Sequence, residues 1–417
     1  MVENYFKRRQ ALRLVLSTPA GPYLPGFTAE LARDGFCYWI LRYRLAGAAH
    51  FSEWSRQKGM PIDQLHEDGL EGFEKHLPKC HCPRPFRRSR HDDVQTISGA
   101  RAFVLYLRQT GVVTSPAPVL RKPDVPPLLA GFRDWMQRQR GAKEGTLLSY
   151  APVIEDALET IGADPTLYNA KSLRTFVLNR TKGVSRSKGK LVVSVLRVFL
   201  RYLIAQGQCR PGLDDAIPTL AMWRLSSLPR YLPAADIERI IKACGQDTPV
   251  GLRDRAVILL LARLGLRAGD IAGMELTDID WRQASVRVSG KSRNEVNLPL
   301  TQEVGEAVWT YLQHGRPPAE TLRLFVRMEA PWGPLKVCAV SELVHRAISR
   351  AKVDAPSHGA HVLRHSAATE MLRQGANLQQ IGVVLRHEYL DTTALYAKVD
   401  VQRLRDIALP WPEVVPY

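Results

Sequence analysis

The sequence predicts a mainly helical protein that contains one small β-sheet, an α+β arrangement. Apolar residues recur at helical spacing along most of the chain, for example over residues 40–59 and 97–111. Residues 285–300 instead alternate apolar and polar side chains on both sides of a Gly-containing turn, which predicts a β-hairpin. Two Pro-rich stretches, 115–127 and 211–233, interrupt the helical pattern and predict linkers between domains.

Length and composition indicate a globular protein of two or three domains. The chain has 417 residues, of which 45% are hydrophobic, and no apolar run is as long as a membrane span. The N-terminus carries charge but too short an apolar segment for a signal peptide. Six cysteines without a framework of spacings indicate a reducing cytosol, so we expect a cytoplasmic protein with no membrane partner.

Positive charge is concentrated in the first 230 residues of a chain whose net charge is +17. Residues 1–120 hold 17 Lys and Arg against 11 Asp and Glu, a surplus of 6. Residues 121–230 hold 18 against 9, a surplus of 9, whereas residues 231–417 hold 23 against 21, a surplus of only 2. A basic surface of this size usually follows a phosphate backbone, so we expect a nucleic-acid partner. A merely soluble surface of high pI is the alternative.

The pattern of helices and linkers predicts three domains. The expected segments are an N-terminal helical domain at 1–114, a linker at 115–127, a second helical domain at 128–210, a linker at 211–233, and a last domain with a C-terminal tail at 234–417. The sequence FVLYLRQTG at 103–111 parallels FLRYLIAQG at 199–207, which indicates a divergent duplication of one helical domain. Amphipathic helices also resemble one another by chance, and that interpretation stays open.

A basic loop at residues 79–93 lies between two predicted helices of the first domain. It contains potential metal ligands: Cys80, His81, Cys82 and His91. The C-x-C pair is not the usual spacing for zinc ligands and prolines stiffen the loop, so we expect no metal, with zinc as the alternative. We expect the loop to contact DNA through its arginines: Arg84, Arg87, Arg88 and Arg90.

A second basic loop, residues 181–190, has the sequence TKGVSRSKGK. Its four cations lie in a Gly/Ser-rich connection, which favours contacts with phosphate groups; a solvated helix connection is the alternative. The predicted DNA-binding residues here are Lys182, Arg186, Lys188 and Lys190.

The stretch from residue 361 to 396 carries the side chains best suited to chemistry. His361 and Arg364 are three residues apart and share one face of a helix, so both can point at one anion. His387 follows, and Tyr396 lies nine residues further on. Each residue alone is weak evidence, because a Tyr on an amphipathic helix usually packs in a core. Together they would suit phosphoryl transfer to a protein hydroxyl.

Two upstream residues complete this set. Arg267 follows Gly265 at the end of an apolar helix, where a side chain can reach into a cleft. Lys291 lies in the turn of the predicted hairpin.

These motifs resemble a known family. The segments LARLGLRAGDIAGMELTDIDW, GKSRNEVNLPL, HVLRHSAAT and LRHEYLDTTALYAKV are similar, in order and spacing, to the catalytic domain of tyrosine recombinases of the phage integrase family. The resemblance covers about residues 232–400, and the second helical domain looks like the family's core-binding domain. Asp270 stands where Glu is commoner, and Arg386 replaces the usual Gly before His387.

The resemblance implies a role for each motif residue. Arg267 and Arg364 would clamp the phosphate, because a guanidinium binds phosphate oxygens in bidentate fashion and Lys cannot. Tyr396 would attack phosphorus to form a 3′-phosphotyrosyl bond, and Lys291 would protonate the leaving 5′-oxygen. His361 would assist proton movement at the Tyr, and His387 would bond a phosphoryl oxygen. No carboxylates are spaced as a two-metal site, so we expect no metal or other cofactor.

The expected function is therefore site-specific DNA recombination, integrating or excising a mobile element. The resemblance implies double-stranded DNA as partner, a dimer on each site, a tetramer at the synapse, and accessory recombinases as further partners. A cytoplasmic protein associated with a bacterial nucleoid is the expected location. A telomere resolvase or type IB topoisomerase-like enzyme, and a non-catalytic architectural DNA-binding protein, are the alternatives.

Overall fold

The computed structural model describes residues 1–65, 67–83, 93–113, 125–220, 229–289, 295–387 and 390–397. The chain forms two compact units, Met1–Ala117 together with Ser227–Tyr417, and Pro118–Ser226. Buried apolar residues form one core within residues 2–113, a second within 129–217, and two adjoining clusters within 232–396. Some predicted features lie outside the described residues: Arg84, Arg87, Arg88, Arg90, His91, Lys291 and the tail from residue 398 onward.

The described residues of the N-terminal part, within 1–113, form five α-helices: α1 (Arg9–Leu16), α2 (Leu24–Arg33), α3 (Tyr38–Gln57), α4 (Glu67–His76) and α5 (Asp93–Gln109). Short 3₁₀ helices precede or join them: Val2–Tyr5, Gly21–Tyr23, Ile62–Gln64 and η4 (Leu77–Lys79). Helices α3 and α5 confirm the helices expected over 40–59 and 97–111. These two helices cross closely, because a Cβ atom on Gly99 would lie 2.6 Å from the Cα of Arg44. Only glycine lets the two backbones approach in this way.

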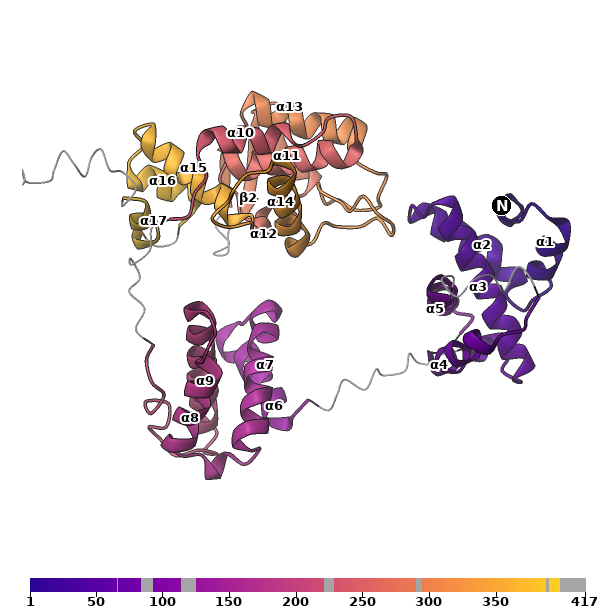
Figure 1. Ribbon diagram of the computed structural model, residues 1–417, viewed down its shortest axis with the longest axis horizontal. Helices are drawn as coiled ribbons and strands as arrows, with labels where there is room; N and C mark the ends of the chain where they lie inside the picture. Colours follow the sequence, from indigo (N-terminus) through magenta and orange to yellow (C-terminus); the bar gives the residue numbers. More distant parts are fainter. Residues whose placement is uncertain are drawn as a thin grey trace, which may run out of the picture. The chain divides into compact units, whose positions relative to one another are not determined.

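Residues 125–220 form a bundle of four α-helices, seen in Figure 1 as α6 (Pro127–Arg140), α7 (Glu144–Ile161), α8 (Ala170–Thr181) and α9 (Arg186–Ala205), with a 3₁₀ turn at Pro165–Leu167. Asn169 and Ser185 begin α8 and α9 by accepting hydrogen bonds from backbone N–H groups of the first turn. The apolar faces of all four helices meet in one core.

The two helical parts share an aromatic arrangement. Phe103 and Tyr106 of α5 stack with ring centroids 6.3 Å apart, and Phe199 and Tyr202 of α9 stack with the same separation. In each part a glycine of an earlier helix packs against the tyrosine hydroxyl: Gly26 and Gly131. The duplication of one helical domain stays our prediction, and this shared packing supports it.

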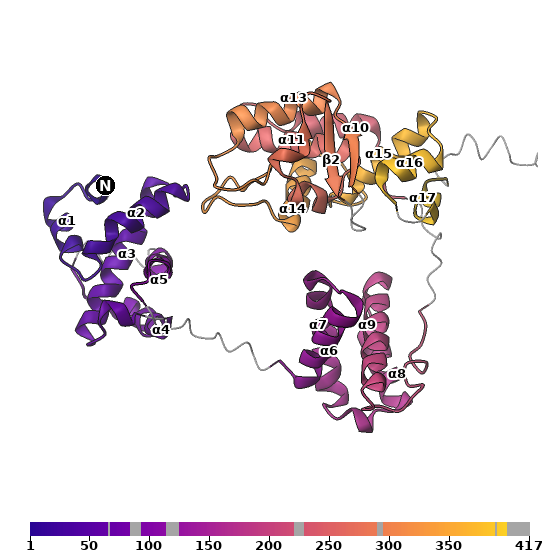
Figure 2. The ribbon, with the colours of Figure 1, turned by 180° about the vertical axis from the view of Figure 1, so that it is seen from behind.

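The C-terminal part contains a three-stranded antiparallel sheet in the order β1 (Ile279–Asp280), β2 (Ser285–Ser289) and β3 (Glu295–Pro299). Val286 pairs with Leu298 and Val288 with Val296, so the expected hairpin is confirmed and its alternating apolar residues share one face. The surrounding elements are α10 (Ala234–Lys242), α11 (Pro249–Arg263), α12 (Ala268–Gly273), a turn at Leu276–Asp278, α13 (Gln302–Thr310), a π-helical turn at Tyr311–Gly315 and α14 (Val337–Ala351). Figure 2 shows the sheet from behind, beside α11, the buried helix that also contacts α13 and α15.

Three further helices complete this part: α15 (His361–Arg373), α16 (Leu378–Leu385) and α17 (Leu390–Ala397), which contact one another. Asn377 caps α16, since its side chain accepts from the N–H of Gln380. Helix α17 begins at Leu390. None of the helices in the described part of the chain is long and apolar enough to cross a membrane.

Candidate active site

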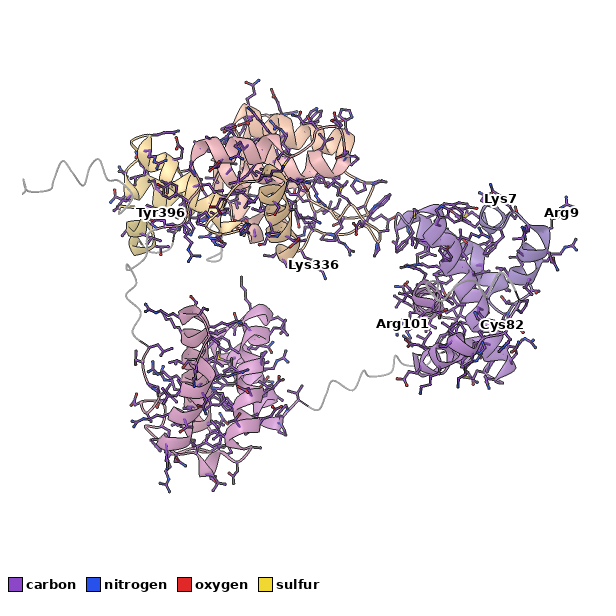
Figure 3. All side chains as sticks on the ribbon, viewed as in Figure 1. Lys7, Arg9, Cys82, Arg101, Lys336 and Tyr396 are labelled. Atoms are coloured by element: carbon purple, nitrogen blue, oxygen red, sulfur yellow. The ribbon has the colours of Figure 1, made fainter. Side chains whose placement is uncertain are left out.

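Tyr396 lies on α17 and is almost completely buried, with 2% of its surface exposed (Figure 3). Its hydroxyl oxygen is 2.8 Å from Nδ1 of His365. Its ring is stacked at 5° to the ring of His387, with centroids 6.4 Å apart. Burial raises the pKa of Tyr396 to about 12, although the charge of Arg364 opposes this shift. The phenol therefore keeps its proton at neutral pH unless a base accepts it.

Two arginines are held beside the tyrosine by backbone carbonyl groups. Arg364, 8% exposed on α15, donates to the carbonyl oxygens of Gly265 and Leu385. Arg267, which caps α12, donates from Nη2 to the carbonyl of Arg386 at 3.1 Å. Burial, together with the charges of Arg267 and Arg386, lowers the pKa of Arg364 to about 10. Both guanidinium groups remain charged at neutral pH, and the carbonyls orient them without neutralising them.

The residue that replaces the usual glycine, Arg386, adds a third guanidinium. It ends α16 in the left-handed conformation, with φ 55° and ψ 51°. Its Nη2 donates to Oδ2 of Asp270, which also accepts the backbone N–H of Arg267 at 2.7 Å. Among the described residues, Nε and Nη1 of Arg386 are buried without a hydrogen-bond partner. Three guanidinium groups around one carboxylate leave an excess of positive charge that suits an anion.

His387 lies beside the tyrosine, with its ring parallel to that of Tyr396. Its Nδ1 is 2.7 Å from the hydroxyl oxygen of Thr393. Burial, together with the charges of Arg364 and Arg267, lowers the pKa of His387 to about 4. The imidazole is therefore neutral at physiological pH, with one ring nitrogen engaged by Thr393.

The two histidines of α15 have different environments. His361, the first residue of the helix, is exposed, and its Nε2 is 2.8 Å from the hydroxyl of Ser357. His365 lies one turn later, and its ring is the one that contacts Tyr396. The pKa of His365 is lowered by burial and then by His361 and Arg364. Sequence reasoning missed His365, although residues 361, 364 and 365 share one helix face.

The structure thus brings four of the six predicted site residues into one pocket: Arg267, Arg364, His387 and Tyr396. His361 lies exposed, and Lys291 lies outside the described residues. Of the predicted DNA-binding residues, four are described, and all are exposed around the junction of α8 and α9: Lys182, Arg186, Lys188 and Lys190.

In the part of the chain that the structure describes, one group of His, Cys, Asp and Glu side chains converges as metal ligands do, and it lies in the N-terminal part: His50, His76, Cys80 and Cys82. The described part of the pocket around Tyr396 contains no comparable set.

Comparisons with known proteins place this geometry in context. The sequence model of the phage integrase family matches residues 230–403. The chain is 35% identical over 404 residues to y4rA of Sinorhizobium fredii, a protein named as an integrase/recombinase, covering 94% of this chain and 96% of the relative. It is 29% identical over 299 residues to the tyrosine recombinase XerD of Yersinia pestis, covering 67% of this chain and 95% of the relative.

A solved structure has the same fold. The Tn1549 transposon integrase, in complex with transposon right end DNA, aligns with a TM-score of 0.52 and 15% identity, covering 67% of this chain and 99% of that one. The match with y4rA extends over nearly the whole of both chains. The chain therefore belongs to the phage integrase family and is a tyrosine recombinase, an enzyme that breaks and rejoins DNA strands.

Proposed function

We propose that the pocket around Tyr396 cuts DNA by transferring a phosphodiester to the tyrosine, at the recombination sites of a mobile element. One observation carries this proposal: a buried tyrosine hydroxyl lies 2.8 Å from an imidazole nitrogen and beside a cluster of guanidinium groups. Nucleophile, base and anion site are the three components that such a transfer needs.

The first step moves one proton and exchanges one bond. The phenol proton of Tyr396 passes to Nδ1 of His365, which can accept it because that imidazole is neutral with its own proton on Nε2. The phenolate oxygen then bonds to phosphorus, and the bond from phosphorus to the 5′-oxygen breaks. Lys291 is the proposed donor of the proton that the leaving 5′-oxygen takes up. The 3′-phosphotyrosyl bond keeps the energy of the phosphodiester, so a 5′-hydroxyl can reverse the step and rejoin strands without nucleotide hydrolysis.

The arginines stabilise the charge that develops on phosphorus. Arg267 and Arg364 present forked donors to the non-bridging oxygens, and preorganised donors in a buried site act more strongly than in water. The ring nitrogen of His387 that does not face Thr393 is free to donate to the same phosphoryl group once it carries the proton. We assign His361 to a supporting position, since its ring centroid is 6.1 Å from that of His365 and its Nε2 faces Ser357.

DNA contacts outside the pocket are proposed at the start of α9. Arg186 and Lys188 lie in the first turn of this helix, which contains no acidic residue. Cations are unfavourable beside the positive end of a helix dipole, so their placement there favours a bound anion. Lys182 and Lys190 extend the same exposed basic surface. The arginines of the 79–93 loop are the second proposed contact region.

The relatives support a role on a mobile element, and the assembly is part of our proposal. The Tn1549 structure contains an integrase with transposon end DNA, and y4rA is named as an integrase/recombinase, which supports a role on a mobile element. We propose a dimer on each site, a tetramer at the synapse and accessory recombinases as partners. Two helical DNA-binding domains preceding the catalytic domain, and a cytoplasmic, nucleoid-associated location, are part of the same proposal.

A covalent adduct tests the mechanism directly. The full-length protein is mixed with a nicked suicide substrate taken from the flanks of its own element, and adduct is measured on a denaturing gel. We expect adduct with the wild-type protein and none with Tyr396→Phe, which loses only the nucleophilic oxygen and keeps DNA binding. An adduct that forms equally with Tyr396→Phe would place the nucleophile elsewhere.

Two further outcomes separate the alternative functions. Binding to the site without any adduct would favour an architectural protein. Relaxation of supercoiled plasmids that lack the site would favour a topoisomerase-like enzyme.

A further inference from the structure

Four potential ligands converge in the N-terminal part, far in sequence from the catalytic motifs. His50 comes from the middle of α3 and His76 is the last residue of α4, while Cys80 and Cys82 follow the 3₁₀ turn η4. One ligand atom from each of the four side chains lies within 4.8 Å of all the others. Cys82 is labelled in Figure 3, at the lower side of this part.

The distances fit a tetrahedral zinc site. Sγ of Cys80 is 3.5 Å from Nε2 of His50, and Sγ of Cys82 is 3.6 Å from Nε2 of His76. Zinc binds thiolate sulfur at about 2.3 Å and imidazole nitrogen at about 2.0 Å, which places sulfur and nitrogen about 3.6 Å apart in a tetrahedron. Thiol–imidazole hydrogen bonds would explain each pair separately. Such hydrogen bonds do not explain why the ligand atoms of both pairs lie within 4.8 Å of one another.

The surroundings also resemble those of a structural metal site. His50 is 1% exposed and Cys80 is 3% exposed, so the ligands face the protein interior. The ring of Phe73 stands edge-on to His50 at 4.9 Å and covers the site with apolar atoms. The backbone N–H of Cys82 donates to Sγ of Cys80 at 3.3 Å, a contact that stabilises a thiolate.

We propose that His50, His76, Cys80 and Cys82 bind one zinc ion. On binding, the two thiols release two protons, and two thiolates with two neutral imidazoles balance the charge of Zn²⁺. Two sulfur and two nitrogen donors are the combination that zinc occupies as a closed, structural site. The ion would fix the chain immediately before the arginines of the 79–93 loop to α3 and α4.

This proposal replaces the expectation of no metal that followed from the C-x-C spacing. The partners weighed from sequence were His81 and His91; His81 is exposed, and His91 lies outside the described residues. The structure instead supplies the two imidazoles from helices α3 and α4, the nearer one four residues before Cys80 and the other thirty.

Metal content of the full-length protein gives the first test. Protein purified without chelators is expected to contain one zinc ion per chain by elemental mass spectrometry. Replacing Cys82, which is half-buried, by Ser should weaken zinc affinity about 100-fold or more, because one of four ligands is lost. His81→Ala and Cys37→Ser, which alter exposed residues, are the matched controls and should keep wild-type affinity. Wild-type zinc affinity in Cys82→Ser would overturn the proposal.

Cobalt provides a readout that does not depend on a destabilised variant. Apo protein titrated with Co²⁺ should develop the intense visible bands of tetrahedral cobalt and a sulfur-to-cobalt charge-transfer band, saturating at one ion per chain. Cys82→His keeps four ligands and one thiolate, so its charge-transfer band should fall to about half while the tetrahedral bands persist. Weak octahedral bands in the wild-type protein, or an unchanged sulfur band in Cys82→His, would show that these side chains do not form the site.

Discussion

The pocket around Tyr396 and the His/Cys cluster of the N-terminal part both bury a pair of imidazoles. In both, burial lowers the pKa of one histidine to about 4: His387 in the pocket and His50 in the cluster. The neighbours differ. Guanidinium groups surround the first pair and thiols accompany the second, so the first site attracts an anion and the second a cation. Burial makes each imidazole neutral, and the surrounding charges determine whether the site binds an anion or a cation.

The largest expected effect on the cleavage rate comes from replacing a guanidinium group at the anion-binding site around Tyr396. Arg364→Lys keeps the charge but loses the two-pronged geometry, so the cleavage step should slow about 100- to 1000-fold, roughly 3–4 kcal/mol. Single-turnover cleavage of the suicide substrate measures this. Arg373→Lys, an exposed change on the same helix, is the control and should leave the rate unchanged. A loss of less than tenfold in Arg364→Lys would remove this residue from the clamp.

The next effect separates the two histidines of α15. His365→Asn keeps a hydrogen-bond acceptor near the phenol but removes the base, so cleavage should fall about 100-fold with DNA binding unchanged. His361→Asn should cost less than about tenfold, because His361 faces Ser357.

The pH dependence of cleavage checks the same assignment. Only neutral His365 can accept the phenol proton, so the rate falls as acid protonates it. The pKa of His365 is below its ordinary value, which places this acid limb below about pH 6.5. This fall of the cleavage rate at low pH should be absent in His365→Asn; if it persists there, another group is the base.

A smaller effect is expected from restoring glycine at position 386. Arg386→Gly removes one guanidinium from the anion site, which should weaken cleavage about tenfold, roughly 1.4 kcal/mol. It also relieves the left-handed backbone conformation but breaks the buried ion pair with Asp270, so the fold should lose stability. Lys352→Gly is the matched control: Lys352 ends α14 with φ 52° and is exposed. It should relieve the same backbone conformation without any loss of cleavage. Equal cleavage by both variants would show that Arg386 does not assist the phosphate.

The smallest effect on the cleavage rate is expected from removing the proposed zinc ion. A zinc chelator added to a preformed protein–DNA complex should change the cleavage rate less than about twofold, since the proposed steps use protons and guanidinium groups only. Metal analysis of the same sample should show that zinc has been removed. A rate that collapses on chelation and returns with Zn²⁺ would place the metal in the catalytic path.

Much of the fold could be predicted from local pattern. The alternation of Val286, Val288, Val296 and Leu298 predicted the hairpin, because period-two spacing places all four on one face. Arg267 was placed correctly between two helices, after Gly265 with its φ of +60°.

The features that were missed depend on contacts between distant residues. The contact of His365 with Tyr396 spans 31 positions, and that of His50 with Cys80 spans 30. Helical periodicity says which residues share a face, but not which other element that face meets. Arg386 was noticed only as a departure from a family pattern, and its contact with Asp270 needed the packing of α12 against the end of α16.

The close crossing of α3 and α5 has a consequence for the arginines of the 79–93 loop. The segment that carries them starts beside Cys82, next to His76, and ends at α5, which Gly99 allows to lie directly on α3. In polymer terms it is a closed loop whose two ends are held on neighbouring helices. The entropy of closing such a loop changes by only about 0.6 kcal/mol when its length doubles. Freeing the Cys82 end should therefore weaken DNA affinity by less than about threefold through chain entropy alone. A larger loss of DNA affinity would mean that the attachment at Cys82 determines where the arginines contact the phosphates.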